Sequence, residues 1–284
     1  MGPQLSGRAN PGITTMTNPP DRSVIHVELH CHTVFSHDGL MTFDSLLRAA
    51  EAVGLDAVAI TDHDTMDGAK EFSRLARSRG SALEIIPGEE KTLADGSHFI
   101  GLFLQEPIAS GDLAGAIQEI ESQGGLCLIP HPFRRKDGLF RDGLERLPLF
   151  EGSVAGFELF SAKCSFAENQ QARSLLGTGL SPFGGSDAHY ESDLGECVNV
   201  ITRSGDLKSS VLGMFGWQAP FQILGKRQEA SAPERAYAPL YYRCRKYVRL
   251  PRSWVPAAKQ CYRWYRNAKY GIGRKSLMEV YADP

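Results

Sequence analysis

Residues 24–39 read VIHVELHCHTVFSHDG, an alternating apolar run that ends in His30-Cys31-His32 and continues into a polar loop. Residues two apart on a β-strand point to the same face, so His30 and His32 project together while Cys31 faces the opposite side. The loop then supplies Asp38. Two imidazoles at a strand end with a carboxylate nearby form a candidate metal site. Because surface histidine pairs are common, the rest of the sequence has to decide whether this pair binds a metal.

The composition is that of a soluble globular protein. The 284-residue chain is 42% apolar and 23% charged, and it is long enough for a substantial buried core. Its formal net charge of −2 hides an uneven distribution, because residues 226–284 hold 14 Lys+Arg against 4 Asp+Glu, and residues 1–225 hold 17 against 29. An acidic body suits a site for several cations, whereas the basic C-terminal segment needs its own explanation.

The six cysteines are scattered, without a CxxC pair or a regular spacing. This pattern argues against a disulfide scaffold and a zinc ribbon, and it fits a reducing cytoplasm. No apolar run reaches the roughly 18 residues that a membrane-spanning helix needs, and the N-terminus lacks the pattern of a signal peptide. We therefore expect a cytoplasmic protein. Residues 1–22, rich in Gly, Pro, Asn and Thr, are expected to form a disordered leader.

From residue 24 onward, strand-like and helix-like patterns alternate. The expected strands are residues 24–32, 57–61, 83–87, 98–104, 126–130, 156–160, 181–185 and 197–202. The expected helices are residues 42–53, 66–79, 112–123, 166–176 and 207–215, with Thr42 and Asp112 as N-caps. This alternation predicts an α/β fold with a mostly parallel sheet or barrel wrapped by helices.

Polar residues gather where several of these strands end. They include Asp62, His63, Asp64, Glu89, Glu90, His131, Glu158, Asp187 and His189. In parallel α/β barrels the C-terminal ends of the strands share one rim, and that rim carries the active site. His98 instead begins its strand, which implies a strand that enters the site in the opposite direction. Six of the eight histidines occupy these positions, so we predict a polynuclear metal site.

In chain order, the motifs HxHTxxSxDG, TDHD, PGxE, HFIGLF, IPHPF and GSDAH cover roughly residues 24–202. Together they resemble the PHP (polymerase and histidinol phosphatase) superfamily of metal-dependent phosphoesterases. The resemblance implies a distorted (β/α)7 barrel of the PHP type, which we place at residues 23–225, followed by a short basic C-terminal extension at residues 226–284. It also implies two or three divalent metal ions, typically Zn, Mn or Fe, at the C-terminal rim of the barrel.

The resemblance further implies nine metal ligands. They form three sets: His30, His32 and Asp187 for one ion; Glu90, His98 and His131 for a second; and Asp38, His63 and His189 for a third. Glu90 would also bridge the first two ions, and its choice over Glu89 rests on the PGxE spacing. Imidazole and carboxylate ligands without a thiolate suit several divalent ions and do not single out one metal.

Three further residues are candidate catalytic groups. Asp64, beside His63, is either a proton donor or a residue that orients a ligand. Arg134, three residues after His131, can supply the guanidinium that a phosphate favours, although a solvated loop position is the other interpretation. Lys163 lies where related sequences often have an Arg. It keeps the positive charge but loses the bidentate geometry of a guanidinium.

Between residues 240 and 275, aromatic and cationic residues alternate, as in YYRCRKYVRL and KQCYRWYRNAKY. Three interpretations remain open. The segment could bind an anionic membrane surface, with Tyr and Trp at the level of the headgroups. It could contact nucleic acid through phosphate charge and base stacking. It could also fold back on the acidic barrel without any separate partner.

These observations predict a hydrolase that acts on phosphate ester bonds. We expect metal-dependent hydrolysis of a small phosphomonoester, such as a nucleotide, sugar or amino-alcohol phosphate, through a hydroxide held between metals at a di- or trinuclear site. An exonuclease or phosphodiesterase acting on oligonucleotide ends is the enzymatic alternative, since relatives of this fold do both. The alternative outside catalysis is a metal-binding regulatory module, and the complete set of nine ligands argues against it.

Overall fold

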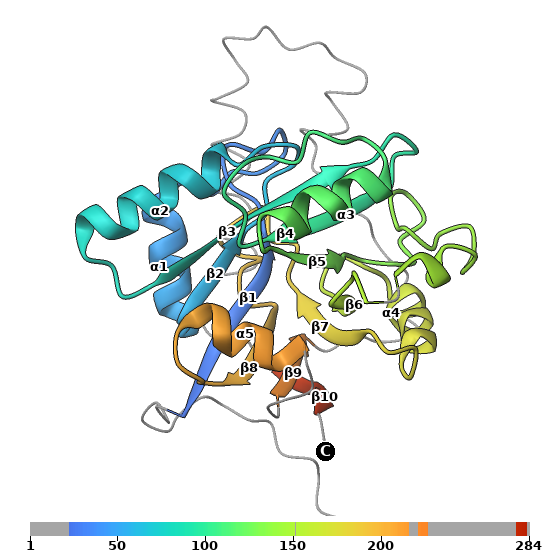
Figure 1. Cartoon of the computed structure of the whole chain (residues 1–284). Helices are drawn as coiled ribbons and strands as arrows, with labels where there is room; N and C mark the ends of the chain where they lie inside the picture. The colour runs from blue at the N-terminus through green and yellow to red at the C-terminus, as the bar shows by residue number, and fades with distance from the viewer. Residues whose placement is uncertain (1–22, 151, 216–220, 227–276, 283–284) are drawn as a thin grey trace, which may run out of the picture.

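The strands form one ten-stranded mixed sheet with helices packed against it (Figure 1). The computed structural model describes residues 23–150, 152–215, 221–226 and 277–282. The expected leader and the basic aromatic segment lie outside these residues. In chain order the elements are β1 (Val24–Cys31), α1 (Phe43–Val53), β2 (Ala57–Ile60), α2 (Asp67–Arg79), β3 (Glu84–Thr92), β4 (His98–Leu102), α3 (Leu113–Ser122), β5 (Leu126–Ile129), η1 (Leu147–Phe150), β6 (Gly156–Ser161), α4 (Phe166–Ala172), η2 (Arg173–Leu175), β7 (Ser181–Gly185), β8 (Cys197–Thr202), α5 (Leu207–Phe215), β9 (Phe221–Lys226) and β10 (Leu277–Ala282).

The strands lie in the order β10-β9-β8-β1-β2-β3-β4-β5-β6-β7. β1, β2 and β3 are parallel to one another, as are β5, β6 and β7. β4 is antiparallel to both of its neighbours, so His98, its first residue, lies at the end of the sheet where the parallel strands finish. This is the reversed strand that the position of His98 predicts. β8, β9 and β10 extend the sheet beyond β1 in antiparallel pairs.

The sheet curls until β7 and the residues after it lie against β1. The His32 N–H donates to the carbonyl of Ala188 at 2.8 Å. The Asn199 side chain of β8 accepts a hydrogen bond from the Gly184 N–H at 2.9 Å, and it donates to the carbonyls of Gly184 and Val27 at 2.8 and 3.2 Å. A side-chain amide thus satisfies backbone groups of β1 and β7 where a continuous ladder is missing. The predicted distorted α/β barrel is confirmed.

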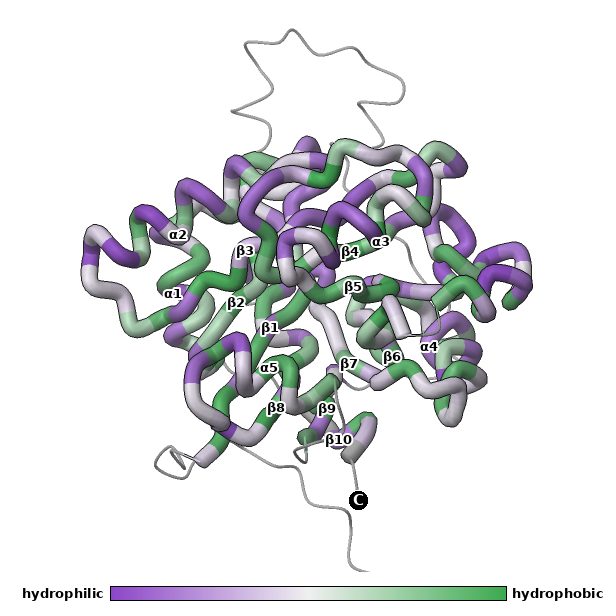
Figure 2. Tube along the Cα trace, viewed as in Figure 1, coloured by the Kyte–Doolittle hydropathy of each residue, from purple (hydrophilic) through white to green (hydrophobic). Residues whose placement is uncertain are grey.

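The helices form on amphipathic segments with well-defined ends. In α1 the Thr42 hydroxyl accepts a hydrogen bond from the Ser45 N–H, and Gly54 ends the helix with φ of 79°, which glycine adopts without steric cost. A buried cluster that includes Phe43 and Phe72 packs α1 and α2 against one side of β1 and β2. α3 lies along β4 and β5, and the strands and the inner faces of the helices carry the apolar residues (Figures 1 and 2).

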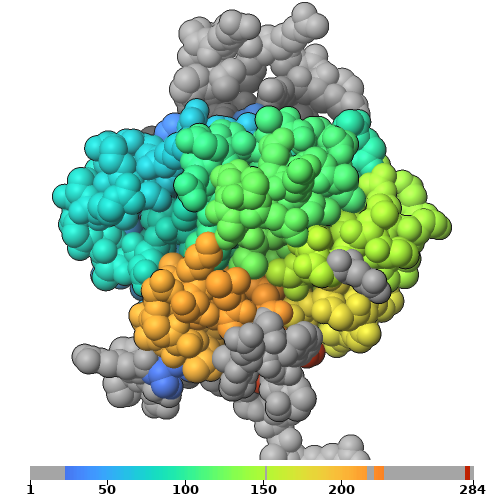
Figure 3. Space-filling view, in the orientation of Figure 1, coloured from blue at the N-terminus to red at the C-terminus, as the bar shows by residue number. Residues whose placement is uncertain are grey.

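In the space-filling view, α2, α3 and α5 form one continuous surface over the sheet on the face shown (Figure 3). The short strand β2 has all four of its residues buried. Within the described ranges, no helix has both the length and the apolar character to cross a bilayer. The hydrophobic core of the domain therefore lies between the sheet and the amphipathic helices that cover it.

The sheet differs from the sequence expectation in two places. The expected strand ended at residue 87, with a polar loop after it. In the structure β3 continues to Thr92 and pairs with β4 over residues 88–92. Glu90 is consequently held within a strand. The sequence also predicted no strands at β9 and β10, which pair with each other across a long sequence separation. The division of the chain into a domain at residues 23–225 and an extension at residues 226–284 stays a prediction.

Candidate metal centre

Three donors from the two sides of the β1–β7 junction face one point. His30 lies near the end of β1 and His32 follows it, so strand geometry projects both rings to the same side. Their Nε2 atoms lie 3.2 Å apart, and both side chains are fully buried. Asp187, which follows β7, places Oδ1 3.2 Å from Nε2 of His32 and 3.6 Å from Nε2 of His30. Two imidazole nitrogens and a carboxylate oxygen at this spacing can hold a divalent cation.

Glu90 lies at the middle of the centre. Its two carboxylate oxygens lie between 2.9 and 3.4 Å from ring nitrogens of five histidines: His30, His32, His63, His98 and His131. Burial by itself would raise the pKa of Glu90, but His98, His30 and His63 hold that pKa well below its usual range. Its neighbour Glu89 is directed elsewhere and accepts a hydrogen bond from the Ile108 N–H at 2.9 Å. Glu90 therefore has the position of a bridging carboxylate.

A second cluster of donors adjoins the first. Oδ2 of Asp38 lies 3.1 Å from Nε2 of His189 and 3.5 Å from Nε2 of His63. Burial alone would raise the pKa of Asp38, but His189 and His63 lower it well below its usual range. Burial alone would lower the pKa of His63, but Glu90 and Asp38 raise it to about 9. At neutral pH this cluster holds a proton that a bound cation has to displace.

All nine predicted ligands belong to such clusters. In the part of the chain that the structure describes, five groups have donor atoms within 4.8 Å of one another: His32, Asp38, His63 and His189; His30, His131 and Asp187; His30, His32 and Glu90; His63, Glu90 and His98; and His98, His131 and Asp137. Asp137 is the one member that the sequence analysis did not single out. Several side chains belong to two groups, so the division of the nine ligands into three sets stays a prediction.

The donor chemistry fits divalent cations. Oε2 of Glu90 and Nδ1 of His63 are buried and lie 3.1 Å apart, but neither makes a well-aligned hydrogen bond among the described residues. Such atoms are rare in folded proteins, because an unpaired buried polar atom costs free energy. A cation bound by these two residues would satisfy both atoms. The mixture of imidazoles and carboxylates suits Zn, Mn and Fe alike.

Comparison with known families agrees with this geometry. Residues 28–171 match the model of the PHP domain, and residues 167–212 match that of the PHP-associated region. The chain belongs to the PHP domain family. An uncharacterized protein of Methanocaldococcus jannaschii is 34% identical over 146 residues, which make up 48% of this chain and 81% of that protein. The prediction that this chain is a hydrolase acting on phosphate ester bonds is confirmed.

Solved structures share the fold of this PHP protein at low sequence identity. A two-domain protein from Bacteroides vulgatus, containing a predicted PHP-like metal-dependent phosphoesterase, has a TM-score of 0.55 at 22% identity, over 76% of this chain and 69% of that chain. A lesion-specific endonuclease from Pyrococcus furiosus has a TM-score of 0.53 at 15% identity, over 68% of this chain and 56% of that chain. At these identities the likeness concerns the fold alone.

Buried carboxylates behind the predicted ligands contact them or the loops that carry them. Oε1 of Glu158, on β6, lies 3.2 Å from Nδ1 of His30, and Oε2 accepts a hydrogen bond from the His131 N–H at 2.7 Å. Asp62 accepts hydrogen bonds from the N–H and the hydroxyl of Thr33, at 2.6 and 2.7 Å. Glu158 thus orients the ring of His30, and Asp62 fixes the start of the loop that follows β1.

Ser36 is a supporting residue that the sequence analysis missed. Its hydroxyl oxygen lies 3.3 Å from Nδ1 of His32 and accepts a hydrogen bond from the His63 N–H at 3.0 Å. The serine is part of the HxHTxxSxDG motif, so the signal was present. Its role depends on the approach of the β2 end to the β1 loop, which spacing along the chain does not reveal.

Of the three predicted catalytic residues, Arg134 directly contacts predicted metal ligands. Its Nη1 lies 2.5 Å from Oδ2 of Asp187, its Nη2 lies 3.0 Å from Nε2 of His131, and its Nε donates to Oδ1 of Asp137 at 2.5 Å. Burial alone would lower the pKa of Arg134, but Asp187 and Asp137 raise it well above its usual range. The guanidinium is therefore a permanent positive charge at the centre.

The other two candidate catalytic residues make contacts beside the centre. Nζ of Lys163 lies 2.6 Å from Oδ2 of Asp193, and the same carboxylate accepts a hydrogen bond from the His189 N–H at 3.3 Å. Asp64 accepts a hydrogen bond from the Thr92 N–H at 2.9 Å, and its side chain is 46% exposed. The catalytic roles of Asp64, Arg134 and Lys163 stay predictions.

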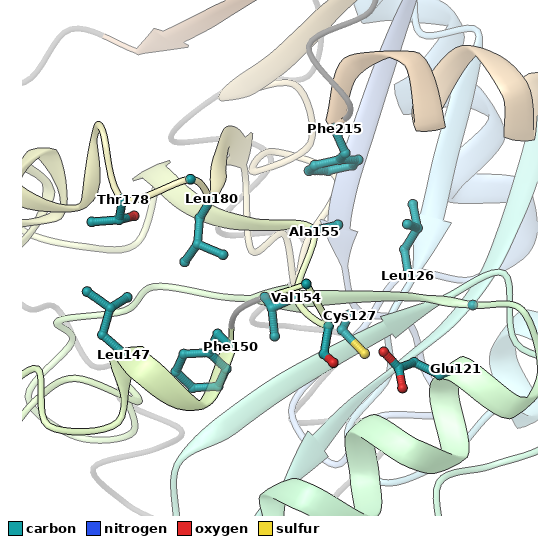
Figure 4. Close-up of a pocket in the computed structure, with 14 residues that line it drawn as sticks. Glu121, Leu126, Cys127, Leu147, Phe150, Val154, Ala155, Thr178, Leu180 and Phe215 are labelled. Atoms are coloured by element: carbon teal, nitrogen blue, oxygen red, sulfur yellow. The ribbon is translucent and has the colours of Figure 1, made fainter.

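A cavity of about 510 Å³, whose lining is drawn in Figure 4, lies at the N-terminal ends of β5, β6 and β7, whereas the metal centre lies at their C-terminal ends. Its lining includes Leu126 at the start of β5, Ala155 just before β6 and Leu180 just before β7, together with the carboxylate of Glu121. None of the predicted site residues belongs to the lining. The cavity therefore plays no part in the geometry of the centre.

Proposed function

We propose that this PHP protein hydrolyses small phosphomonoesters with two or three divalent cations held by the nine donors. The observation that carries the proposal is the position of Glu90, whose carboxylate oxygens lie within 3.4 Å of ring nitrogens of five histidines. A carboxylate shared by adjacent donor clusters is typical of centres with more than one metal. Such centres stabilise the attacking and leaving oxygens of a phosphate ester together.

Three sets of ligands would hold the cations. His30, His32 and Asp187 would bind one ion, with Glu90 bridging to a second ion at His98 and His131. Asp38, His63 and His189 would bind the third. We propose Zn, Mn or Fe as the native metals, since this donor set suits each of them.

Divalent cations, when bound, supply positive charge to the phosphate oxygens and lower the pKa of a bound water molecule. The chain's own residues have the remaining tasks. Arg134, fixed by Asp137 and Asp187, presents a planar set of donors that matches phosphate oxygens. Lys163 supplies a second positive charge near His189. The partly exposed Asp64 either donates a proton to the leaving oxygen or orients His63.

The substrate class is a proposal in its own right. A nucleotide, sugar or amino-alcohol phosphate is our first choice, because a domain of about 200 residues has little room for the insertions that a large polymer cleft needs. An exonuclease or phosphodiesterase acting on nucleic-acid ends is the second choice, supported by the fold that the chain shares with a lesion-specific endonuclease. A regulatory module without turnover is the third, and all nine ligands being present speaks against it.

Hydrolysis of p-nitrophenyl phosphate and bis(p-nitrophenyl) phosphate tests this proposal. Protein stripped of metal would be compared with protein reconstituted with Mn, Zn or Fe(II). We expect metal-dependent turnover of the monoester, lost in His32→Ala. His26→Ala is the matched control, because His26 lies on β1 in the same register as His30 but pairs with Asp56 instead of the centre.

Preferential turnover of the diester would favour the nucleic-acid alternative. Absence of turnover with every metal, while elemental analysis shows metal bound, would contradict the proposed phosphomonoesterase and favour the regulatory module.

A further inference from the structure

The loop after β1 presents exposed side chains beside the metal centre. Val34 and Phe35 are 44% and 41% exposed, although the preceding Thr33 is fully buried. The side chain of His37 is 66% exposed. We call residues 34–37 the β1 loop tip. Adjacent exposed apolar and aromatic side chains at the edge of a polar site are typical of a surface that binds part of a ligand.

Direct contacts tie the β1 loop tip to the centre. Ser36 contacts both His32 and His63 through its hydroxyl oxygen. The His37 ring lies 5.0 Å from the His63 ring, with 32° between their planes. Nε2 of His37 lies 3.6 Å from Oδ2 of Asp38. The tip therefore borders Asp38 and His63, two donors of the predicted third ion.

The Phe35 backbone and one edge of its ring contact the rest of the fold. Its backbone N–H donates to the Thr33 hydroxyl at 3.2 Å, and that hydroxyl is itself bound to Asp62. The ring meets Phe72 of α2 edge-on, with centroids 6.1 Å apart and 80° between the planes. An aromatic side chain has only two rotatable bonds, so it loses little conformational freedom when a ligand stacks on it.

We propose that Phe35 and His37 are specificity-determining residues that stack on a planar ring carried by the leaving group of the substrate. This inference rests on the proposed function and deepens it, because it favours esters with a nucleobase over sugar or amino-alcohol phosphates. An aromatic side chain stacks on any nucleobase, and such contacts raise affinity by about tenfold or more. The nucleobase could belong to a free nucleotide or to the end of an oligonucleotide.

Two esters with the same leaving oxygen isolate the contribution of the ring. Adenosine 5′-monophosphate and ribose 5-phosphate both release a primary alcohol, so their chemical reactivity is matched. We expect kcat/KM of the metal-loaded protein to be about tenfold higher for the nucleotide. Short 5′-phosphorylated oligonucleotides with a normal or an abasic first nucleotide form the second arm. If the base changes kcat/KM more in the oligonucleotides than in the mononucleotide pair, the nucleobase that the protein recognises belongs to an oligonucleotide end.

Variants separate stacking from folding. In Phe35→Leu the apolar volume is retained and the ring is lost, so the ratio of the two kcat/KM values should fall at least fivefold. Phe35→Tyr keeps the ring and should retain the ratio. His37→Ala should lower it, whereas Leu212→Ala, which removes a 41% exposed side chain from α5, should not. Metal content by elemental analysis confirms that each variant retains its centre.

A ratio near one in the unmodified protein, or a ratio that Phe35→Leu leaves unchanged, would overturn the inference. If no ester is hydrolysed, the proposed function fails, and calorimetric binding of the two compounds to the metal-loaded protein then decides. Binding of adenosine 5′-monophosphate that exceeds ribose 5-phosphate and depends on Phe35 supports the stacking surface even in that case.

Discussion

Oε1 of Glu158 lies 3.2 Å from Nδ1 of His30, and both side chains are fully buried. A proton on Nδ1 of His30 can be donated to this carboxylate, which leaves Nε2 as the nitrogen that faces Glu90 and Asp187. The other oxygen of Glu158 binds the backbone of His131. One residue of β6 thus contacts two predicted metal ligands, one from β1 and one from the end of β5.

Replacement of Glu158 by Gln is expected to weaken metal binding. Gln keeps the shape but has one acceptor oxygen in place of two, so either the His30 or the His131 contact is lost. Loss of such a supporting contact typically costs about 10- to 100-fold in metal affinity. Competition with a fluorescent chelator measures the affinity, and circular dichroism checks the fold.

Glu106→Gln is the control for this change, because the Glu106 side chain is 75% exposed and pairs with Lys70 at the surface. Its metal affinity should match that of the unmodified protein. Equal affinities in Glu158→Gln and Glu106→Gln would show that Glu158 does not position the ligands.

Metal binding is expected to release protons and to strengthen as the pH rises. The pKa of His63 is raised to about 9 by Glu90 and Asp38, against the effect of burial. Below pH 9 this ring is therefore largely protonated without metal, and a cation that binds it must displace the proton. The apparent affinity should rise about tenfold per pH unit for each proton released. Calorimetry in two buffers of different ionisation enthalpy counts those protons.

The raised pKa of His63 has the opposite effect on the stability of the metal-free protein, which should fall as the pH rises. The imidazolium of His63 stabilises the fold fully below its unfolded pKa of about 6.5, and this contribution is lost as the pH rises through about 9. In His63→Gln the free energy of unfolding should depend less on pH, and metal binding should release about one proton fewer. Identical proton counts in the two proteins would contradict the proposed ligand role of His63.

Much of the centre could be predicted from the sequence because strand geometry dictates it. Parallel strands finish at one end of the sheet, so the polar side chains that follow them had to meet there. His98 was recognised from its place at the start of a strand. The extent of β3 was missed, since Gly88, Glu89 and Glu90 look like a loop, and a carboxylate is stable in this strand only because histidines surround it.

What could not be predicted are contacts that depend on the closing of the sheet. Asn199 reads as one polar residue in the apolar run CVNVIT, and only the approach of β7 to β1 gives it three partners. Asp137 reads as part of a charged loop, but it supports Arg134 and lies near His131. β9 and β10 pair across about 50 intervening residues, a separation at which local patterns carry no information on partners.

Asn199→Ala is expected to destabilise the barrel by about 3 kcal/mol. The substitution leaves the Gly184 N–H and the carbonyls of Gly184 and Val27 without their partner, and an unsatisfied buried group typically costs about 1–3 kcal/mol. The free energy of unfolding from urea titrations, measured with a chelator present, gives the size of the effect. Ser174→Ala, which removes one exposed hydroxyl bonded to the Gln171 carbonyl, should change it by less than about 0.5 kcal/mol.

A change as small for Asn199→Ala as for Ser174→Ala would mean that the junction of β7 with β1 does not depend on this side chain. Metal loading offers a further readout. Asp187 and His30 lie on opposite sides of the junction, so ligand binding should recover part of the lost stability.

Arg134→Ala is expected to lower kcat/KM for phosphomonoesters about 100-fold, because the guanidinium is the cation that lies directly against Asp187 and His131. Arg134→Lys keeps the charge but loses the fork that Asp137 fixes, so we expect it to recover only part of the activity. Arg135→Ala is the matched control. The Arg135 side chain is next to Arg134 in the sequence but is exposed, so the activity of this variant should be unchanged. Metal content measured in parallel separates loss of phosphate binding from loss of metal. Full activity of Arg134→Ala with metal retained would remove Arg134 from the mechanism and leave Lys163 as the remaining candidate for the phosphate contact.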